Sequence, residues 1–511
     1  MRSQTWRIVG LVLSGAIFVI AFVIPAVVLM ARLLREGVAP TDGFTISVRQ
    51  WRLLADSLML ALGGAGVSLL LALPGAFVWG SARRGLVPGG VTLCLLLGCL
   101  ISPMVHCFGW QQMFGLAGAG GRWAPAACAV VWGSWIWPVP AFIIGSGWRR
   151  EGREAYEAAL LLCSPGRAFL RIALPLLARY VLLSMLIVFV LLCGEYAVPH
   201  AWGLRVYATE LLSWSTATTR TIDAVWPVLP LLGCMAVVGA AAVLVARRFQ
   251  SGAPGSARIE PRAISTGPTV LCLLVFTVTV ALPIGGLVWR LGSLDVIRQA
   301  WDVHGGDLVR SVGLMAAAGC AALVMAVGLL FAPALWRFAL ITAIVFGVLP
   351  GALVGEAVYG TFVMAEEFMP GALGGAGPWY DHWIMVVLGM TAKYAWIGFL
   401  IIGAAMMTRQ REIEEQASTD GAAWGEIVRH IRLARHYPAV LCALFVTIGF
   451  ALADVAAATQ VQVSSVRLVS LLLVEAMHRF EDELLISISL WLVIAALPGG
   501  LAAVWTIRRS E

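Results

Sequence analysis

The stretch EAALLLCSPGRAFLRIALP, residues 157–175, is a charged, amphipathic island between long apolar runs. The chain carries a second such island about 258 residues later, EQASTDGAAWGEIVRHIRL, residues 415–433. Each island ends just before an apolar run that is long enough to enter a membrane. We therefore expect two related halves, each with one surface island between membrane-spanning helices.

Composition places the chain among integral membrane proteins. Of its 511 residues, 60% are hydrophobic and 12% are charged, and the mean hydropathy is +0.90, which is far from a soluble chain. The net charge of +7 comes almost wholly from arginine, because Lys393 is the only lysine. The arginines cluster between apolar runs, which favours membrane topology over nucleic-acid binding. Neither the ten cysteines nor the seven histidines show metal-ligand spacing, so we predict no metal site and no disulfide framework.

A bilayer core of about 30 Å needs about 20 apolar residues per helix. This length predicts an all-α, polytopic membrane protein with about twelve transmembrane helices. We expect two pseudo-symmetric six-helix halves, related by a two-fold axis along the membrane normal. The predicted spans lie near 8–31, 53–80, 87–110, 124–147, 177–198, 225–246, 268–290, 309–333, 338–363, 383–407, 438–458 and 485–507.

The predicted halves are 1–246 and 268–511, joined by a polar linker over 247–267. Their islands occupy 153–175 and 412–435. Arginine is most abundant around the islands, so the positive-inside rule places both islands and both termini in the cytoplasm. The second and eighth spans are rich in Gly and Ala and are expected in the packed interior of each half.

Each island has the local signals of a helix, a turn and a second short helix. In the second island we expect a turn at Asp420-Gly421, because glycine tolerates positive φ. The following helix should place Trp424, Ile427, Ile431 and Ala434 on one face, with Glu426, Arg429 and His430 toward the other. In the first island, Ser164-Pro165 supplies an N-cap and a first-turn proline.

These islands resemble the EAA loop of type I ABC importer permeases, whose motif is close to E-A-A-x3-G-x9-I-x-L-P. Two loops in one polypeptide are similar to the fused permeases of ferric-iron and thiamine uptake. The first copy differs by Cys163 near the glycine and by one residue fewer, and the second by Gln416 and Ala434. The residues that would couple to an ATPase are Glu157, Ala158, Ala159, Ser164, Phe169, Ile172, Leu174 and Pro175, and Glu415, Ala417, Gly421, Ile427, Ile431 and Leu433.

The resemblance implies a multi-pass permease of a bacterial inner (plasma) membrane, docked on a cytoplasmic ABC ATPase homodimer that binds ATP and Mg²⁺. It also implies a periplasmic solute-binding protein as a partner. The chain itself has no P-loop, because Lys393 follows Ala392 rather than a glycine, so we expect no catalytic residue and no cofactor here. Ferric iron is the first solute that the resemblance suggests, with thiamine, polyamines, phosphonate or sulfate as alternatives.

Four ionisable residues inside the apolar runs are candidates for the translocation path, since such groups are costly in lipid. Glu195 and Asp454 occupy the same place in each half, 21 residues after Leu174 and Leu433. They either flank the path or cap a helix end or pair with arginine. Glu356 and Lys393 either line the path or pair with each other. In an outer loop, Glu366 and Glu367 either contact the solute-binding protein or are simply solvated.

Two other function classes stay open. An ion-coupled secondary transporter with two six-helix repeats would use Glu195, Asp454 or Glu356 and would need no ATPase. A membrane-embedded enzyme would need clustered carboxylates or a strong base at the membrane face, and the sequence has no such cluster.

Overall fold

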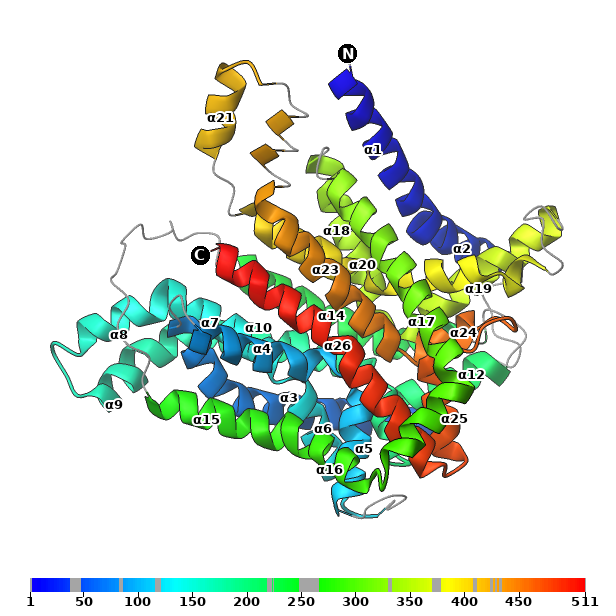
Figure 1. The fold of residues 1–511 in the computed structure, drawn as a ribbon, viewed down its shortest axis with the longest axis horizontal. Coiled ribbons are helices and arrows are strands. Elements are labelled where there is room, and N and C mark those ends of the chain that lie inside the picture. The colour runs from blue at the N-terminus through cyan, green and yellow to red at the C-terminus, as the bar shows by residue number, and fades with distance from the viewer. Residues whose placement is uncertain are drawn as a thin grey trace. The chain divides into compact units, whose positions relative to one another are not determined.

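The computed structural model (Figure 1) describes residues 2–36, 47–81, 86–114, 121–217, 223, 225–247, 266–329, 333–369, 378–407, 411–422, 426–427, 430–431 and 434–510. Within these ranges every named element is a helix, so the predicted all-α fold is confirmed. The predicted linker lies almost wholly outside the described residues, as does Leu433.

Apolar helices dominate the described ranges, as expected of a multi-pass membrane protein. Eight of them are long and apolar enough to cross a bilayer, and three bent pairs raise the number of spans to as many as eleven. The bent pairs coincide with the predicted spans 87–110, 124–147 and 338–363, and the predicted span 438–458 meets a shorter helix, Tyr437–Ala453. The count of twelve stays a prediction.

Unit 2 of the fold comprises residues 45–210 and 227–290. The long helix α3 is its centre, because α6, α7, α10 and α15 all pack on it. Small residues permit this packing: a Cβ added at Gly80 would lie 2.6 Å from the carbonyl oxygen of Gly145. The helices are α3 (Val48–Ser81), α4 (Leu86–Leu100), α5 (Pro103–Phe114), α6 (Ala124–Ile136), α7 (Pro138–Gly147), η2 (Trp148–Gly152), α8 (Arg153–Ala159), α9 (Pro165–Ala168), η3 (Phe169–Ala173), α10 (Leu174–Cys193), α11 (Ala197–Ala201), the first turn of α12 (Tyr207–Ala217), α14 (Leu229–Arg247), α15 (Thr266–Phe276), η5 (Thr277–Ala281) and α16 (Leu282–Arg290).

Unit 1 comprises residues 1–44, 211–226 and 291–510. Its central helix is α17, which packs against α1, α20 and α23. The predicted interior role of the second and eighth spans is thus seen in both units. The helices are α1 (Arg2–Phe18), η1 (Val19–Val23), α2 (Ile24–Glu36), α17 (Leu294–Leu329), α18 (Pro333–Val348), α19 (Gly351–Phe368), η6 (Trp379–Asp381), α20 (Trp383–Met407), α21 (Arg411–Thr419), α23 (Ala434–Ala453), α24 (Ala456–Val461), α25 (Val469–His478) and α26 (Asp482–Ser510).

The compact units do not follow the order of the chain. The first span, α1 to α2, belongs with residues 291–510, and the span after the linker, α15 to α16, belongs with residues 45–210. Each half of the sequence therefore contributes its first span to the unit that contains most of the other half. The predicted halves describe a sequence repeat, and that division stays a prediction.

Several local features recur at matching places in the two halves. Each first span contains a π-helical turn, η1 or η5, followed by a proline at Pro25 or Pro283. Each third span bends sharply just before a proline, by 92° at Pro103 and by 112° at Pro350. Proline lacks an N–H and disfavours a helical residue before it, which explains the breaks. These matches favour the predicted repeat.

Candidate functional site

The first island is a helical hairpin, α8 and α9, at one end of unit 2 (Figure 1). Ser164 has the extended backbone of an N-cap residue and Pro165 follows at the first helical position, as predicted, although the Ser164 hydroxyl makes no capping hydrogen bond. Between the helices, Leu161 and Leu162 are 86% and 90% exposed. Two adjacent leucines therefore form the apolar tip of this hairpin.

The base of the first island is tied to the membrane helices of its own unit. Phe169 packs on Phe77 of α3, with ring centroids 5.6 Å apart, and Ala173 is fully buried. Glu151 accepts a hydrogen bond from the Tyr180 hydroxyl at 2.9 Å and forms an ion pair with Arg179. These contacts hold the base of the island against α3 and α10.

The second island begins with α21, which ends at the predicted turn. Gly421 has a φ of +87°, a conformation that favours glycine. The N–H of Gly421 bonds to the carbonyl of Ser418 at 3.2 Å and that of Ala422 to Ala417 at 2.9 Å, which is the hydrogen-bond pattern of a Schellman cap. The prediction of a helix that ends at Asp420-Gly421 is confirmed.

Of the residues in the predicted faces, Trp424 and Arg429 lie outside the described residues, and those that the structure describes agree with the prediction. Ile427 is buried and Ile431 is half-buried, whereas Glu426 and His430 are exposed. Of the other coupling candidates, Glu415 is exposed and Ala417 is half-buried. Where the first island has Leu161-Leu162, the second has Thr419-Asp420, both exposed, at the position 258 residues later. The two islands therefore present different chemistry at equivalent places.

Glu195 and Asp454 have the same environment in the two units. The carboxylate of Glu195 accepts the N–H groups of Ala197 at 2.6 Å and Val198 at 3.2 Å. That of Asp454 accepts those of Ala457 at 2.7 Å and Ala458 at 3.3 Å. Each acid thereby binds the first turn of a short helix, α11 or α24, as an N-cap does.

An aromatic side chain from the fourth span of each half completes these caps. The Trp132 indole donates to Glu195 at 2.6 Å, and the Tyr394 hydroxyl donates to Asp454 at 2.5 Å. The capping alternative is thus what the geometry displays, and a place on the translocation path stays a prediction for both acids.

Glu356 and Lys393 do not form the expected pair. Glu356 accepts a charged hydrogen bond from Arg32 of α2 at 3.4 Å, and a Cβ added at Gly360 would meet the same guanidinium. Lys393 donates to the carbonyl oxygens of Gly347, at 2.9 Å, and Leu349. These carbonyls lie at the break between α18 and α19, where the helix leaves them without an intrahelical donor.

The residue equivalent to Lys393 does the same in the first half. Trp135, 258 residues earlier, donates its indole N–H to the carbonyl of Cys99 at 3.2 Å, at the end of α4. The side chain differs, but at both positions it donates to carbonyl oxygens near the bend of the third span. This supports a structural role for Lys393.

Sequence reasoning missed three features, two of which a repeat comparison could have found. Arg32 and Arg290 lie 258 residues apart, so they occupy matching places near the end of the first span of each half. Ser57 and Ser311 lie at matching places near the start of the second and eighth spans, and each hydroxyl accepts a helix N-terminal N–H. The donors are Tyr207 at 2.8 Å and Val469 at 3.0 Å.

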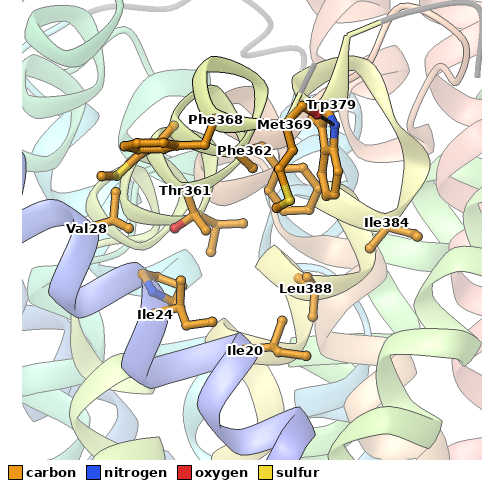
Figure 2. Close-up of a pocket in the computed structure, with 14 residues that line it drawn as sticks. Ile20, Ile24, Val28, Thr361, Phe362, Phe368, Met369, Trp379, Ile384 and Leu388 are labelled. Atoms are coloured by element: carbon orange, nitrogen blue, oxygen red, sulfur yellow. Dashed lines mark hydrogen bonds between the residues drawn. The ribbon is translucent and has the colours of Figure 1, made fainter. Parts of the chain in front are cut away.

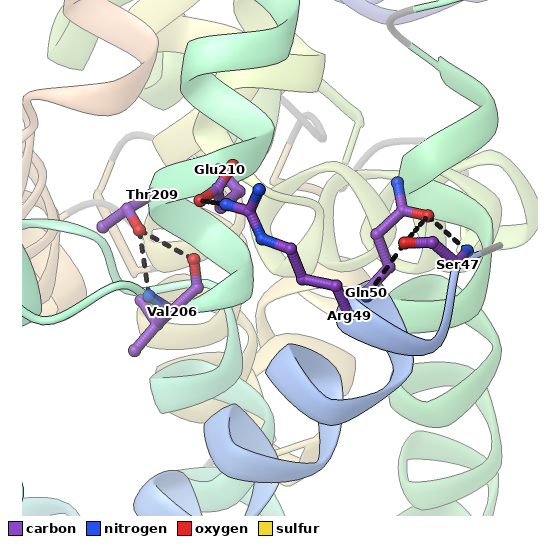
Figure 3. A network of polar contacts seen from close by, with 6 residues as sticks. All are labelled: Ser47, Arg49, Gln50, Val206, Thr209 and Glu210. Atoms are coloured by element: carbon purple, nitrogen blue, oxygen red, sulfur yellow. Dashed lines mark hydrogen bonds and ion pairs between the residues drawn. The ribbon is translucent and has the colours of Figure 1, made fainter.

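The third missed feature is the polar network at the start of α3 (Figure 3). Ser47 and Gln50 exchange side-chain to backbone hydrogen bonds, at 2.8 Å and 3.2 Å, which is a capping box. Between them in sequence, Arg49 reaches Glu210 of α12 at 3.0 Å. The signal was the spacing Ser-x-x-Gln.

The prediction that Glu366 and Glu367 lie in an outer loop is wrong, because both belong to the last turn of α19. The Glu366 carboxylate accepts the N–H of Trp379 at 2.8 Å, and Glu367 lies 3.8 Å from Arg35. Both carboxylates thus have partners within unit 1.

Comparison of the chain with protein-family models, curated proteins and solved structures finds no match in any of the three.

Proposed function

We propose that this chain is the transmembrane permease subunit of an ATP-driven ABC importer. The observation that carries the proposal is the pair of surface islands, each a short helical segment directly followed by a long apolar helix, α10 or α23. Their motifs resemble EAA loops, and two copies in equivalent places fit a permease in which both halves are fused. The chain would form the solute path and transmit movement, while a separate subunit hydrolyses ATP.

In this proposal the islands are the docking elements for a cytoplasmic ATPase homodimer. Leu161 and Leu162 would enter an apolar depression of the partner, because two leucines exposed beyond 80% gain free energy when another protein buries them. The second island would dock through polar contacts at Thr419 and Asp420. Closure of the ATPase dimer would then draw both islands together and reorient the membrane helices.

The finer parts of the proposal follow from the sequence. About twelve spans would form two six-helix halves, with islands and termini in the cytoplasm by the positive-inside rule. The host membrane would be a bacterial inner membrane, and a solute-binding protein would deliver the solute from outside. The resemblance favours ferric iron as the solute, ahead of thiamine, polyamines, phosphonate and sulfate.

A second candidate is an ion-coupled secondary transporter. It is favoured by charged groups held inside apolar helices, namely the Arg32–Glu356 pair and Lys393, because such groups often carry ions or protons across membranes. This candidate would leave the islands without a docking function.

The test is transport by the purified chain in proteoliposomes, with and without the ATPase that co-purifies with it. The proposal expects ATP-dependent, vanadate-sensitive uptake that is lost in Glu415→Arg and in the double variant Leu161→Ser with Leu162→Ser. Uptake that persists in the absence of any ATPase, driven by an ion gradient, would refute the importer and establish the second candidate.

A further inference from the structure

Unit 1 contains an apolar pocket of about 530 Å³ beside the first span (Figure 2). One wall is the face of η1 and α2 that carries Ile20, Ile24 and Val28. The other walls come from α19, including Phe362, and from α20, including Leu388. This volume is in the range of ordinary small-molecule sites. We refer to it as the first-span pocket.

The side chains that line the pocket offer no free hydrogen-bond donor. The Thr361 hydroxyl donates to the carbonyl of Ala357 at 2.9 Å. The Trp379 indole N–H donates to the carbonyl of Met369 at 2.8 Å. A polar ligand would lose its hydration there without replacement, so the pocket favours a hydrocarbon chain.

The pocket lies among helices that are candidates to cross a membrane. Its walls belong to candidate spans, Ile8–Arg35 and the bent pair that includes Gly351–Phe368. Ile20 is 43% exposed, so the lining continues onto the exposed face of the first candidate span, which contacts lipid once the helix is embedded in a membrane. An acyl chain can therefore enter from the bilayer without crossing water.

The charged residues at the end of the first span indicate which headgroup the acyl chain carries. Residues three and four apart share a helix face, so the pocket-lining face that carries Val28 continues to Arg32 and Arg35. Arg32 is engaged by Glu356 at 3.4 Å. Arg35 stays 82% exposed beside Glu367, at 3.8 Å, a weak surface pair that leaves the planar fork of the guanidinium open to a phosphate.

We propose that the first-span pocket holds one acyl chain of a membrane phospholipid, with the lipid phosphate at Arg35. The lipid fills the space between the first span and α19, and thus stabilises the packing of a helix that is far in sequence from its neighbours. This site depends only on membrane embedding and is independent of any transport mechanism.

The test uses the full chain in nanodiscs that contain a phospholipid with a diazirine at the end of one acyl chain. After irradiation, peptide mapping should find adducts concentrated in residues 20–28 and 358–369. Ala365→Phe adds bulk inside the pocket and should reduce these adducts about tenfold, since excluding roughly two methylenes has that effect. Leu388→Phe is a second filling variant in case the first does not fold.

Val27→Phe is the matched control, because Val27 lies on the same helix, is exposed and does not line the pocket. It should leave the adducts unchanged. Arg35→Gln should reduce them several-fold, and a free fatty acid with the same diazirine should label these segments far less. Adducts spread evenly over the lipid-facing helices, or equal labelling in Ala365→Phe and the wild type, would overturn the pocket. Undiminished labelling in Arg35→Gln, or equal labelling by the fatty acid, would overturn the phospholipid.

Discussion

At the scale of single residues, Glu195 and Asp454 each satisfy backbone N–H groups that lipid cannot satisfy. The short helices α11 and α24 follow these acids directly, and the first N–H groups of a helix have no partner within it. In a membrane each unsatisfied group is expensive. An acid at this place in both halves therefore has a structural reason to be there, whatever its part in transport.

Replacing Glu195 by alanine removes the acceptor for two backbone N–H groups and for the Trp132 indole. We expect Glu195→Ala to lower the free energy of unfolding by about 1–3 kcal/mol, the cost of leaving a buried donor unsatisfied. Glu195→Gln retains a carbonyl acceptor and should cost less. Thermal unfolding in detergent measures both.

Trp132→Phe is the control for the caps, since it removes the indole donor and leaves the backbone bonds. If Glu195→Ala unfolds at the wild-type temperature, the capping role is wrong. If Glu195→Gln unfolds normally but abolishes uptake, the acid also acts on the path.

A pH dependence is expected at Glu475, which lies in α25. The hydrogen bond from Arg467, with the charges of Arg467 and Arg479, holds the pKa of this carboxyl below its usual value. A depressed folded-state pKa stabilises the fold above the ordinary pKa of glutamate, and this stabilisation is lost as the pH falls through the lower value. Hydrogen exchange of residues 467–481 should therefore accelerate as the pH is lowered below the ordinary glutamate range, after correction for the intrinsic rate. Glu475→Gln should abolish this change, and an identical profile in the variant would contradict the assignment.

The sequence predicted which acids and which glycine matter but not what they touch. Gly421 was predictable because positive φ is a local property. The partners of Glu356 and Lys393 were not, because Arg32 and Glu356 are 324 residues apart. Charge alone does not determine which of several distant groups a side chain meets.

At the scale of elements, the two islands are alike in backbone plan and unlike at their tips. The double variant Leu161→Ser with Leu162→Ser should weaken binding of the ATPase by roughly a hundredfold, since burying a leucine contributes about 1.5–3 kcal/mol. Thr419→Ala at the equivalent position should change binding by less than about tenfold. The measurement is ATPase affinity for the purified chain.

If the leucine double variant and Thr419→Ala weaken ATPase binding equally, the apolar tip at Leu161 and Leu162 contributes no more to binding than the polar one. Retention of full affinity in the leucine double variant would show that the ATPase does not dock on this tip.

The positions of the apolar runs were predictable, and the directions of the helices within them were not. The apolar run 87–110 reads as one helix, yet it divides at Ile101-Ser102-Pro103 into α4 and α5. The run 124–147 bends by 52° at Pro138, whereas its counterpart α20, without a proline, does not break. Mean hydropathy over a window of residues detects an apolar run. It does not detect a change in helix direction at a proline within that run.

At the scale of the whole molecule, the packing of the first span on α17 is the feature that sequence patterns could not supply. The Ser14 hydroxyl donates to the carbonyl of Val324 at 2.8 Å, and a side chain at Gly328 would collide with Ser14 and with the carbonyl of Gly10. An apolar sequence pattern predicts that a helix enters the membrane. It does not predict which helix will be its neighbour. In unit 2, Gly109 allows the same close approach to Pro283.

Gly328→Val should therefore destabilise the packing of the first span. The expected loss of folding free energy is about 1–3 kcal/mol, as is usual when a side chain is forced into a filled site. Gly313→Val is the matched control, because Gly313 lies on the same helix with no atom near its Cβ position. Thermal unfolding and proteolysis between residues 2 and 36 measure the effect. Equal unfolding of the two variants would refute the packing of α1 on α17.

The membership of the first span in unit 1 has a consequence for biogenesis. Arg32 emerges from the ribosome 324 residues before Glu356, and Ser14 emerges 310 residues before Val324. At about 5–20 residues per second, the nascent first helix waits on the order of tens of seconds before its neighbours are synthesised. During that interval an unneutralised guanidinium lies at the membrane, and an insertase or a bound anionic lipid is what would shelter it. A ribosome that stalls between the two halves would leave an orphan helix for the cell's quality-control proteases.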